Sequence, residues 1–196
     1  MEAAIFDIGN VLLLFDYMKA ANRLARKNGL GPLPDRTIIT AASHAFELGR
    51  STRAQFLSVV RREFHDTGEE EEFVAIWEDI FEENTRMTAF ARDLSKRIPV
   101  FMISNIGEIH HRYIFRKFDV FSIFRDRIFS YLDGLMKPDP AVFELAKSRF
   151  GVKPAATVYI DDIQENCAAA SAAGFLGLHY DQRRQDLPQA WEIQTA

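Results

Sequence analysis

The sequence predicts an α/β protein: a doubly wound parallel sheet into which an all-helical segment is inserted. Three observations support this. Short apolar runs end abruptly at polar residues, helical patterns separate most of these runs, and one long stretch near the amino end contains helical patterns alone. Strands that alternate with helices pair in parallel, because a helical crossover returns the chain to the end of the sheet where the previous strand began, and the next strand then runs in the same direction.

Five apolar runs are predicted to be strands. The three clearest are rich in β-branched or aromatic residues and end at Asp7, Ser104 and Asp161. Their hydrophobicity is continuous rather than alternating, which is expected when helices cover both faces of a sheet. In chain order the predicted strands span residues 3–6, 100–103, 128–131, 157–160 and 176–180. The patterns at 128–131 and 176–180 are the weaker ones.

Helical patterns lie between these strands. Asp139 and Pro140 predict a helix start, because Asp caps free N–H groups and Pro at the first helical position has no N–H to lose. Gly151 and Gly174 are placed to end helices. The predicted helices of this part span residues 88–97, 108–118, 140–150 and 165–173.

Residues 17 to about 85 interrupt the alternation and contain four helical patterns. Glycines separate the patterns, and Thr52 with Gln55 forms a capping box at the start of one of them. We therefore predict an α/β core formed by residues 1–15 and 86–196, with a helical insertion at 16–85. The four predicted helices span residues 17–27, 35–48, 52–64 and 69–82.

Composition limits the class of protein. The chain has 196 residues, of which 47% are hydrophobic and 27% charged, as in an ordinary globular protein. A net charge of −4 argues against a nucleic-acid partner. The apolar runs are far shorter than the ~20 residues that span a bilayer, so no membrane partner is expected. The single cysteine, Cys167, has no internal disulfide partner, and we expect a cytoplasmic protein. The sequence does not reveal the oligomeric state.

Polar residues follow the strands where each strand ends. Function in parallel sheets collects at the carboxyl ends of the strands, so Asp7, Ser104, Asp161 and Asp162 are expected to meet there, with Lys137 from a nearby loop. Clustered carboxylates raise one another's pKa unless a cation lies between them. Carboxylate oxygens suit Mg²⁺, and a lysine offsets the charge of a phosphate in the same site. The set favours phosphoryl transfer.

These residues, in this order, resemble the motifs of the haloacid dehalogenase superfamily, and the resemblance covers nearly the whole chain. It implies a Rossmann-like core, a helical cap at 16–85, and a nucleophile at Asp7, assisted by Lys137, that becomes an aspartyl-phosphate. It implies that phosphate is bound by Ile8, Gly9, Ser104, Asn105 and Lys137. It implies that Mg²⁺ is held by Asp7, the carbonyl of Gly9, Asp161 and Asp162.

Gly9 departs from the family pattern, because most of its phosphatases carry an acid–base Asp at this position. The carbonyl of Gly9 can still bind Mg²⁺, but glycine cannot transfer a proton. Sugar-phosphatase-like members with an Asp-x-Gly-Asn-Val first motif resemble residues 7–11. We hypothesise that Asp16 supplies the missing proton transfer.

The resulting expectation is a Mg²⁺-dependent phosphatase that acts on a small phosphorylated metabolite through an aspartyl-phosphate on Asp7. Three alternatives stay open: a phosphotransferase, a hydrolase of a non-phosphate substrate, and a non-catalytic ligand-binding member, the last because of Gly9. The sequence leaves the substrate undetermined.

Overall fold

The computed structural model describes residues 1–31, 33–34 and 36–181. Five parallel strands form one sheet in the order β5-β4-β1-β6-β7. Their bounds are β1 Ala3–Phe6, β4 Val100–Ser104, β5 Asp126–Phe129, β6 Thr157–Asp161 and β7 Leu176–His179. The central strand β1 is fully buried, with Ile5 opposite Phe101 on one side and Tyr159 on the other. The predicted parallel α/β sheet is confirmed.

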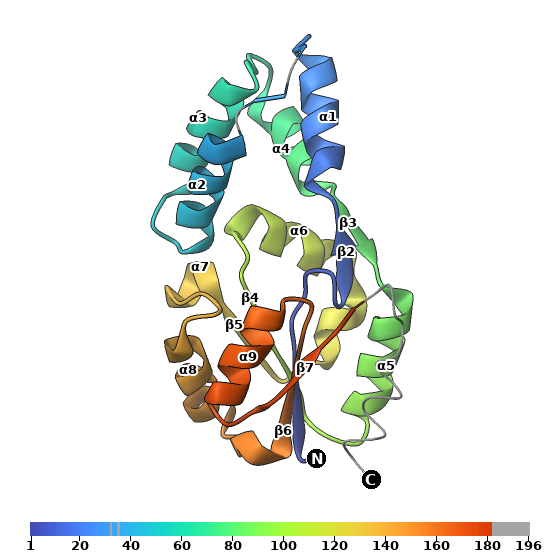
Figure 1. Ribbon diagram of the computed structural model, residues 1–196. Coiled ribbons are helices and arrows are strands. Elements are labelled where there is room, and N and C mark those ends of the chain that lie inside the picture. Colours follow the sequence, from blue (N-terminus) through green and yellow to red (C-terminus); the bar gives the residue numbers. More distant parts are fainter. Residues whose placement is uncertain (32, 35, 182–196) are drawn as a thin grey trace.

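Helices cover both faces of the sheet (Figure 1). Ala4 and Phe6 of β1 belong to a core cluster that includes residues of α5 (Thr85–Ser95) and α6 (Glu108–Lys117). Ala3 and Ile5 belong to a second cluster, with α8 (Pro140–Phe150) and α9 (Gln164–Ala172). Successive residues of one strand therefore enter different cores, which explains why the apolar runs do not alternate with polar residues.

Four further helices pack together beyond the carboxyl ends of the strands (Figure 1). They are α1 (Tyr17–Lys27), α2 (Arg36–Glu47), α3 (Arg53–Glu63) and α4 (Glu70–Glu78), and we call them the four-helix segment. This segment has its own apolar cluster, which includes Phe73 and Trp77. The predicted capping box at Thr52 is present at the start of α3.

A two-stranded antiparallel ribbon, which was not predicted from the sequence, joins this segment to the sheet. The helix predicted at 69–82 ends at Glu78, and Phe81–Glu83 forms β3, which pairs with β2 (Leu13–Phe15). The prediction of helix for this end was wrong because Phe81 lies opposite Phe15 across the ribbon. A pairing between residues so far apart in sequence has no local pattern.

One predicted strand is displaced along the chain. The strand expected at 128–131 begins two residues earlier, and Ser130–Asp133 forms a short helix, α7. The side chain of Asp133 accepts a hydrogen bond from the Phe129 N–H at 3.0 Å, which favours the turn after the strand. Short 3₁₀ helices at Asp119–Ile123 and Pro154–Ala156 were also not predicted. Residues 182–196 of the predicted core lie outside the described residues.

Two structural observations bear on the predicted absence of a membrane partner and on the single cysteine. Among the described residues, no helix is both long enough and apolar enough to cross a bilayer. Cys167 is buried, and burial raises the pKa of its thiol to about 12. The thiol is therefore protonated at neutral pH and is a poor nucleophile.

Candidate active site

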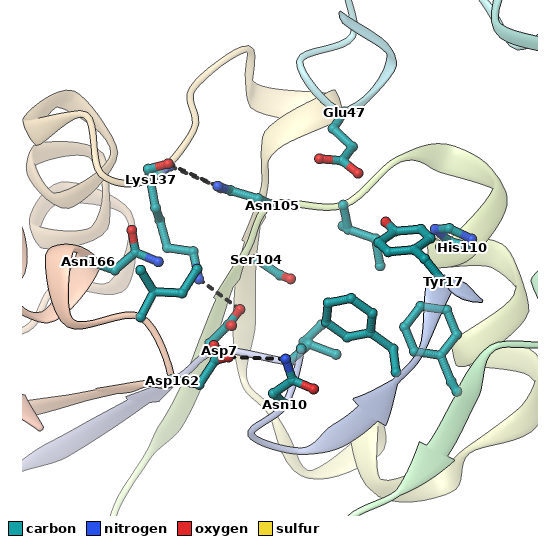
Figure 2. Close-up of a pocket in the computed structure, with 16 residues that line it drawn as sticks. Asp7, Asn10, Tyr17, Glu47, Ser104, Asn105, His110, Lys137, Asp162 and Asn166 are labelled. Atoms are coloured by element: carbon teal, nitrogen blue, oxygen red, sulfur yellow. Dashed lines mark hydrogen bonds and ion pairs between the residues drawn. The ribbon is translucent and has the colours of Figure 1, made fainter. Parts of the chain in front are cut away.

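The carboxyl ends of three neighbouring strands meet at one pocket of about 160 Å³ (Figure 2). Asp7 follows β1, Ser104 ends β4, and Asp162 follows β6. Lys137 reaches the same pocket from the loop between α7 and α8. The structure thus brings together side chains from four separate parts of the chain, as expected for parallel strands that share an edge.

Lys137 is the charged centre of this pocket. Its Nζ lies 2.7 Å from Asp7 Oδ1 and 2.7 Å from Asp161 Oδ2. All three side chains are buried. Asn105 holds the backbone of Lys137 from both sides, because its amide donates to the Lys137 carbonyl and its Oδ1 accepts from the Lys137 N–H, each at 2.9 Å. Asn105 lines the pocket, and these two hydrogen bonds position Lys137.

The two adjacent aspartates have different surroundings. Both carboxylate oxygens of Asp161 accept hydrogen bonds, from Asn166 at 3.0 Å, from the Ile163 N–H at 2.8 Å, and from the Tyr159 hydroxyl. With Lys137 added, Asp161 contacts four neighbouring groups. Asp162 is half-buried and accepts from Asn10 Nδ2 at 3.1 Å, so its carboxylate is the more open of the two.

The donor set fits a divalent cation. Carboxylate oxygens of Asp7, Asp161 and Asp162 all lie within 4.8 Å of one another. Burial raises the pKa of Asp7 to about 7; the Lys137 ammonium lowers it, and Asp161 raises it further. Three carboxylates beside one ammonium carry a formal charge of −2 when ionised, which a dication would neutralise. A hard cation such as Mg²⁺ prefers these oxygen ligands.

Ile8 and Gly9 line the pocket, and Gly9 does so in a crowded place. The Ile8 side chain is buried in the core, so this residue faces the pocket with its backbone. A Cβ added at Gly9 would lie 2.9 Å from Cε1 of Phe15, which is closer than ordinary contact. The Phe15 ring therefore fills the space that an acid–base Asp would need.

Asp16 does not reach the pocket. It is exposed, its Oδ1 accepts a hydrogen bond from the Met18 N–H at 2.8 Å, and it caps α1. Asp16 is absent from the described residues that line the pocket. The structure gives this carboxylate a capping role, which is a common use of Asp before a helix, and the proton-transfer hypothesis finds no support in its position.

We predict that Gly9→Asp is poorly accommodated because of Phe15. Overpacking of this kind destabilises by about 1–3 kcal/mol. In a Phe15→Ala background the same substitution should destabilise less, since the ring is gone. A double-mutant cycle by urea unfolding measures the difference. An equal loss of stability from Gly9→Asp in both backgrounds would show that the Phe15 ring does not prevent an Asp side chain from fitting at position 9.

Several of the described residues that line the pocket were not among the predicted site residues, and Tyr17, Glu47 and Asn166 are three of them. Asn166 lies in the first turn of α9, and its side-chain amide donates to both carboxylate oxygens of Asp161 at 3.0 Å. Tyr17 begins α1 and Glu47 ends α2, and their side chains lie close to each other at the pocket (Figure 2). Such a contact has no local sequence signal.

His110 faces the same pocket from α6 and is buried. Burial lowers its pKa to about 4, although a bond to the Trp77 carbonyl opposes this. The ring is neutral at pH 7, so Nε2 carries the hydrogen that it donates to that carbonyl at 3.2 Å. His110 is therefore part of the packing between α6 and α4 rather than a charged group of the pocket.

The lowered pKa of His110 predicts a pH dependence of stability. Its folded pKa lies below the unfolded value of about 6.5, so unfolding takes up a proton as pH falls from 6.5 to 4. This one group should lower the free energy of unfolding by about 3 kcal/mol across that window. His110→Gln should remove that part of the slope in urea unfolding curves, whereas His44→Gln, at an exposed histidine of α2, should keep it. An unchanged slope in His110→Gln would contradict the prediction.

Comparison with known proteins agrees with this architecture. A protein from Bacteroides thetaiotaomicron described as a HAD family enzyme, bt-2542, superposes with a TM-score of 0.84 and 20% identity over 97% of this chain and 98% of its own. A second structure of that protein, solved with magnesium and inorganic phosphate, gives 0.81 and 21% over 92% and 94%. A HAD-like family hydrolase from Porphyromonas gingivalis gives 0.80 and 19% over 100% and 98%. At these identities the likeness shows the fold.

Sequence relatives cover shorter stretches. The chain is 36% identical over 101 residues to a protein of Aspergillus oryzae (strain ATCC 42149 / RIB 40) named sesquiterpene phosphatase astK, which is 49% of this chain and 50% of that protein. It is 36% identical over 50 residues to acyl-CoA dehydrogenase family member 10 of Mus musculus, 26% of this chain and 4% of that protein. The chain thus spans half or less of these curated relatives. The model of the haloacid dehalogenase-like hydrolases matches residues 1–174, and the chain belongs to that family.

Proposed function

We propose that this hydrolase is a Mg²⁺-dependent phosphatase that removes the phosphoryl group from a small phosphorylated metabolite through an aspartyl-phosphate on Asp7. The observation that carries the proposal is the buried Lys137, which holds Asp7 and Asp161 at the pocket that Ser104 also lines. A buried lysine between two carboxylates is suited to an anionic substrate, because the ammonium offsets the charge of an arriving phosphate. The Aspergillus oryzae relative named a phosphatase supports this reaction class.

In the proposed first step, a carboxylate oxygen of Asp7 attacks phosphorus and the bond to the leaving oxygen breaks. Lys137 holds the Asp7 oxygen that it contacts, which orients the other oxygen for attack. The hydroxyl of Ser104 binds a phosphoryl oxygen. In the second step water attacks the aspartyl-phosphate and releases phosphate. Mg²⁺ bound by Asp7, Asp162 and the Gly9 carbonyl would screen the phosphate charge, as the magnesium and phosphate complex of the Bacteroides protein supports.

We further propose that residues 16–85, which include the four-helix segment, act as a cap over a core formed by residues 1–15 and 86–196. Tyr17 and Glu47 of this range line the pocket, whose other walls include the strand-end residues Asp7 and Ser104, so both parts of the chain border the pocket. A cap placed there limits the access of water during the first step, which favours transfer to Asp7 over side reactions.

Metal removal tests the proposed function. Hydrolysis of 4-nitrophenyl phosphate should fall to a few per cent or less in EDTA and return when excess Mg²⁺ is added, because the carboxylate cluster repels a phosphate without a cation. The control is Asp93→Asn, at an exposed aspartate, and its activity should respond to EDTA and Mg²⁺ as that of the wild type does. Halide release from a 2-haloacid without metal would contradict the phosphatase. Binding of phosphate without turnover of any phosphate ester would support the non-catalytic alternative.

A further inference from the structure

A second, larger cavity adjoins the catalytic pocket on the side of the four-helix segment. Its volume is about 420 Å³, against about 160 Å³ for the catalytic pocket. The two spaces share wall residues from the ribbon, the four-helix segment and the strand-end loops: Phe15, Tyr17, Glu47, Asn105 and Ile163. A molecule whose phosphate lies at Asp7 can therefore extend into the larger cavity.

The walls of this cavity are mainly hydrocarbon. Phe64 and Trp77 are 1% and 4% exposed and lie in the apolar cluster of the four-helix segment. Other apolar walls come from the ribbon, α1, the following loop and α2: Phe15, Met18, Leu33 and Ile39. Among the polar walls Arg36, Thr40 and His44 are exposed, and the half-buried Glu47 and Asn105 lie where the cavity meets the catalytic pocket. A polar substrate group, such as a sugar ring, that lay against Phe64, Trp77 and Ile39 would lose its hydrogen bonds to water without replacing them there.

We propose that the substrate is the phosphate monoester of an apolar alcohol and that its hydrocarbon chain occupies this cavity. The inference rests on the proposed phosphatase function and names its substrate class. The volume of about 420 Å³ equals roughly fourteen water-sized groups at about 30 Å³ each, so it suits a chain on the order of ten carbons or more. The chain lies along the walls named above, and the phosphate lies at Asp7.

A chain-length series tests this directly. We would measure kcat/KM for n-alkyl phosphates of four to fourteen carbons with Mg²⁺, below their micelle concentrations. Burial of one methylene corresponds to up to about a fourfold gain in affinity, so kcat/KM should rise steeply with length and level off when the cavity is full. A flat profile would overturn the proposed substrate class while leaving the phosphatase intact.

Two alanine-to-phenylalanine variants locate the effect. Ala21 of α1 lines the cavity, so Ala21→Phe should shift the optimum to shorter chains and lower kcat/KM for decyl phosphate about tenfold or more. Ala41 of α2 is exposed and outside the cavity walls, and Ala41→Phe should keep the wild-type profile. If no phosphate ester is hydrolysed, the proposed function fails. The affinities of decylphosphonate and butylphosphonate, measured by calorimetry, then test whether the cavity binds a hydrocarbon chain. Equal binding of the two would overturn the inference.

A different observation concerns the proton that Gly9 cannot supply. Glu47 ends α2, and its carboxyl group faces the catalytic pocket from above, close to Tyr17 (Figure 2). Glu47 is half-buried, and 37% of the Tyr17 surface is exposed, since both residues border the open pocket. Burial raises the pKa of Glu47 to about 7, although the neighbouring Tyr17 hydroxyl opposes this rise. A carboxyl group in this position can hold a proton at neutral pH.

We infer that Glu47 is the proton donor to the leaving oxygen. As Asp7 attacks, the bond from phosphorus to the leaving oxygen breaks, its electron pair stays on that oxygen, and Glu47 donates its proton there. The products are the alcohol, the aspartyl-phosphate and the Glu47 carboxylate. In the second step this carboxylate takes a proton from the attacking water, and Asp7 and phosphate are released. This assignment also rests on the proposed function.

The dependence of rate on the leaving group tests the assignment. Glu47→Gln should lower kcat for alkyl phosphates, whose leaving oxygen needs a proton, by about 10²–10⁴-fold. It should lower kcat for 4-nitrophenyl phosphate by less than about tenfold, because nitrophenolate leaves without a proton. Glu71→Gln, at an exposed glutamate of α4, should match the wild type on both. Equal losses on both substrates, or none, would overturn the assignment, whereas a wild type inactive on both would overturn the proposed function.

Discussion

Asp7→Asn should lower kcat by at least about 10³-fold on every substrate, with the fold retained. The amide has nearly the shape of the carboxylate and keeps an oxygen for Lys137, but it lacks the anionic oxygen that would attack phosphorus. Single-turnover kinetics with wild-type enzyme should show a phosphorylated protein intermediate after acid quench, and the variant should show none. The matched control is Asp93→Asn, at an exposed aspartate of α5, which should keep wild-type kcat.

This result is independent of substrate identity, because Asp7 lies at the strand end and not among the walls of the larger cavity. Retention of more than a few per cent of the wild-type rate in Asp7→Asn would remove this residue from the nucleophile role. Loss of activity together with loss of the folded near-ultraviolet circular dichroism spectrum would instead indicate that Asp7 is needed for folding.

Lys137→Met should affect both stability and activity. Removing the ammonium leaves Asp7 and Asp161 buried without their shared cation, and breaking a buried pair in this way costs about 3–5 kcal/mol. Turnover should fall by about 10²–10³-fold, as for loss of one preorganised electrostatic contact. Urea unfolding and kcat measure the two effects. Exposed Lys153→Met, which breaks a surface ion pair with Glu2, should change stability by less than about 1 kcal/mol.

A second variant separates the electrostatic explanation from simple packing. In the double variant Lys137→Met/Asp161→Asn one buried charge is also removed, so the stability loss should be smaller than in Lys137→Met alone. Turnover should stay low, because the lysine is still missing. If the double variant is less stable by the full sum of the two single changes, the ion pair between Lys137 and Asp161 does not account for the effect.

Much of the sheet and of the strand-end cluster was predictable from the sequence. Asp7, Ser104 and Asp161 each follow or end an apolar run that is too short for a helix, and parallel strands bring such ends to one edge. Caps and glycines likewise act within a few residues, as the capping box at Thr52 shows. These sequence signals are local, and the parallel arrangement of the strands brings the residues that carry them close together at one site.

The tertiary structure alone decided how the pocket is completed. Phe15 covers the space beside Gly9 because β2 pairs with β3, whose residues come more than sixty positions later. Glu47 meets Tyr17 because α1 and α2 belong to one packed helical segment, and the apolar cavity exists because its helices leave space between them. Asp161 is occupied by Lys137, Tyr159 and Asn166, whereas Asp162 stays open, although the two are neighbours in sequence. Each of these contacts depends on side-chain packing between distant segments, for which residue order and local propensity carry no information.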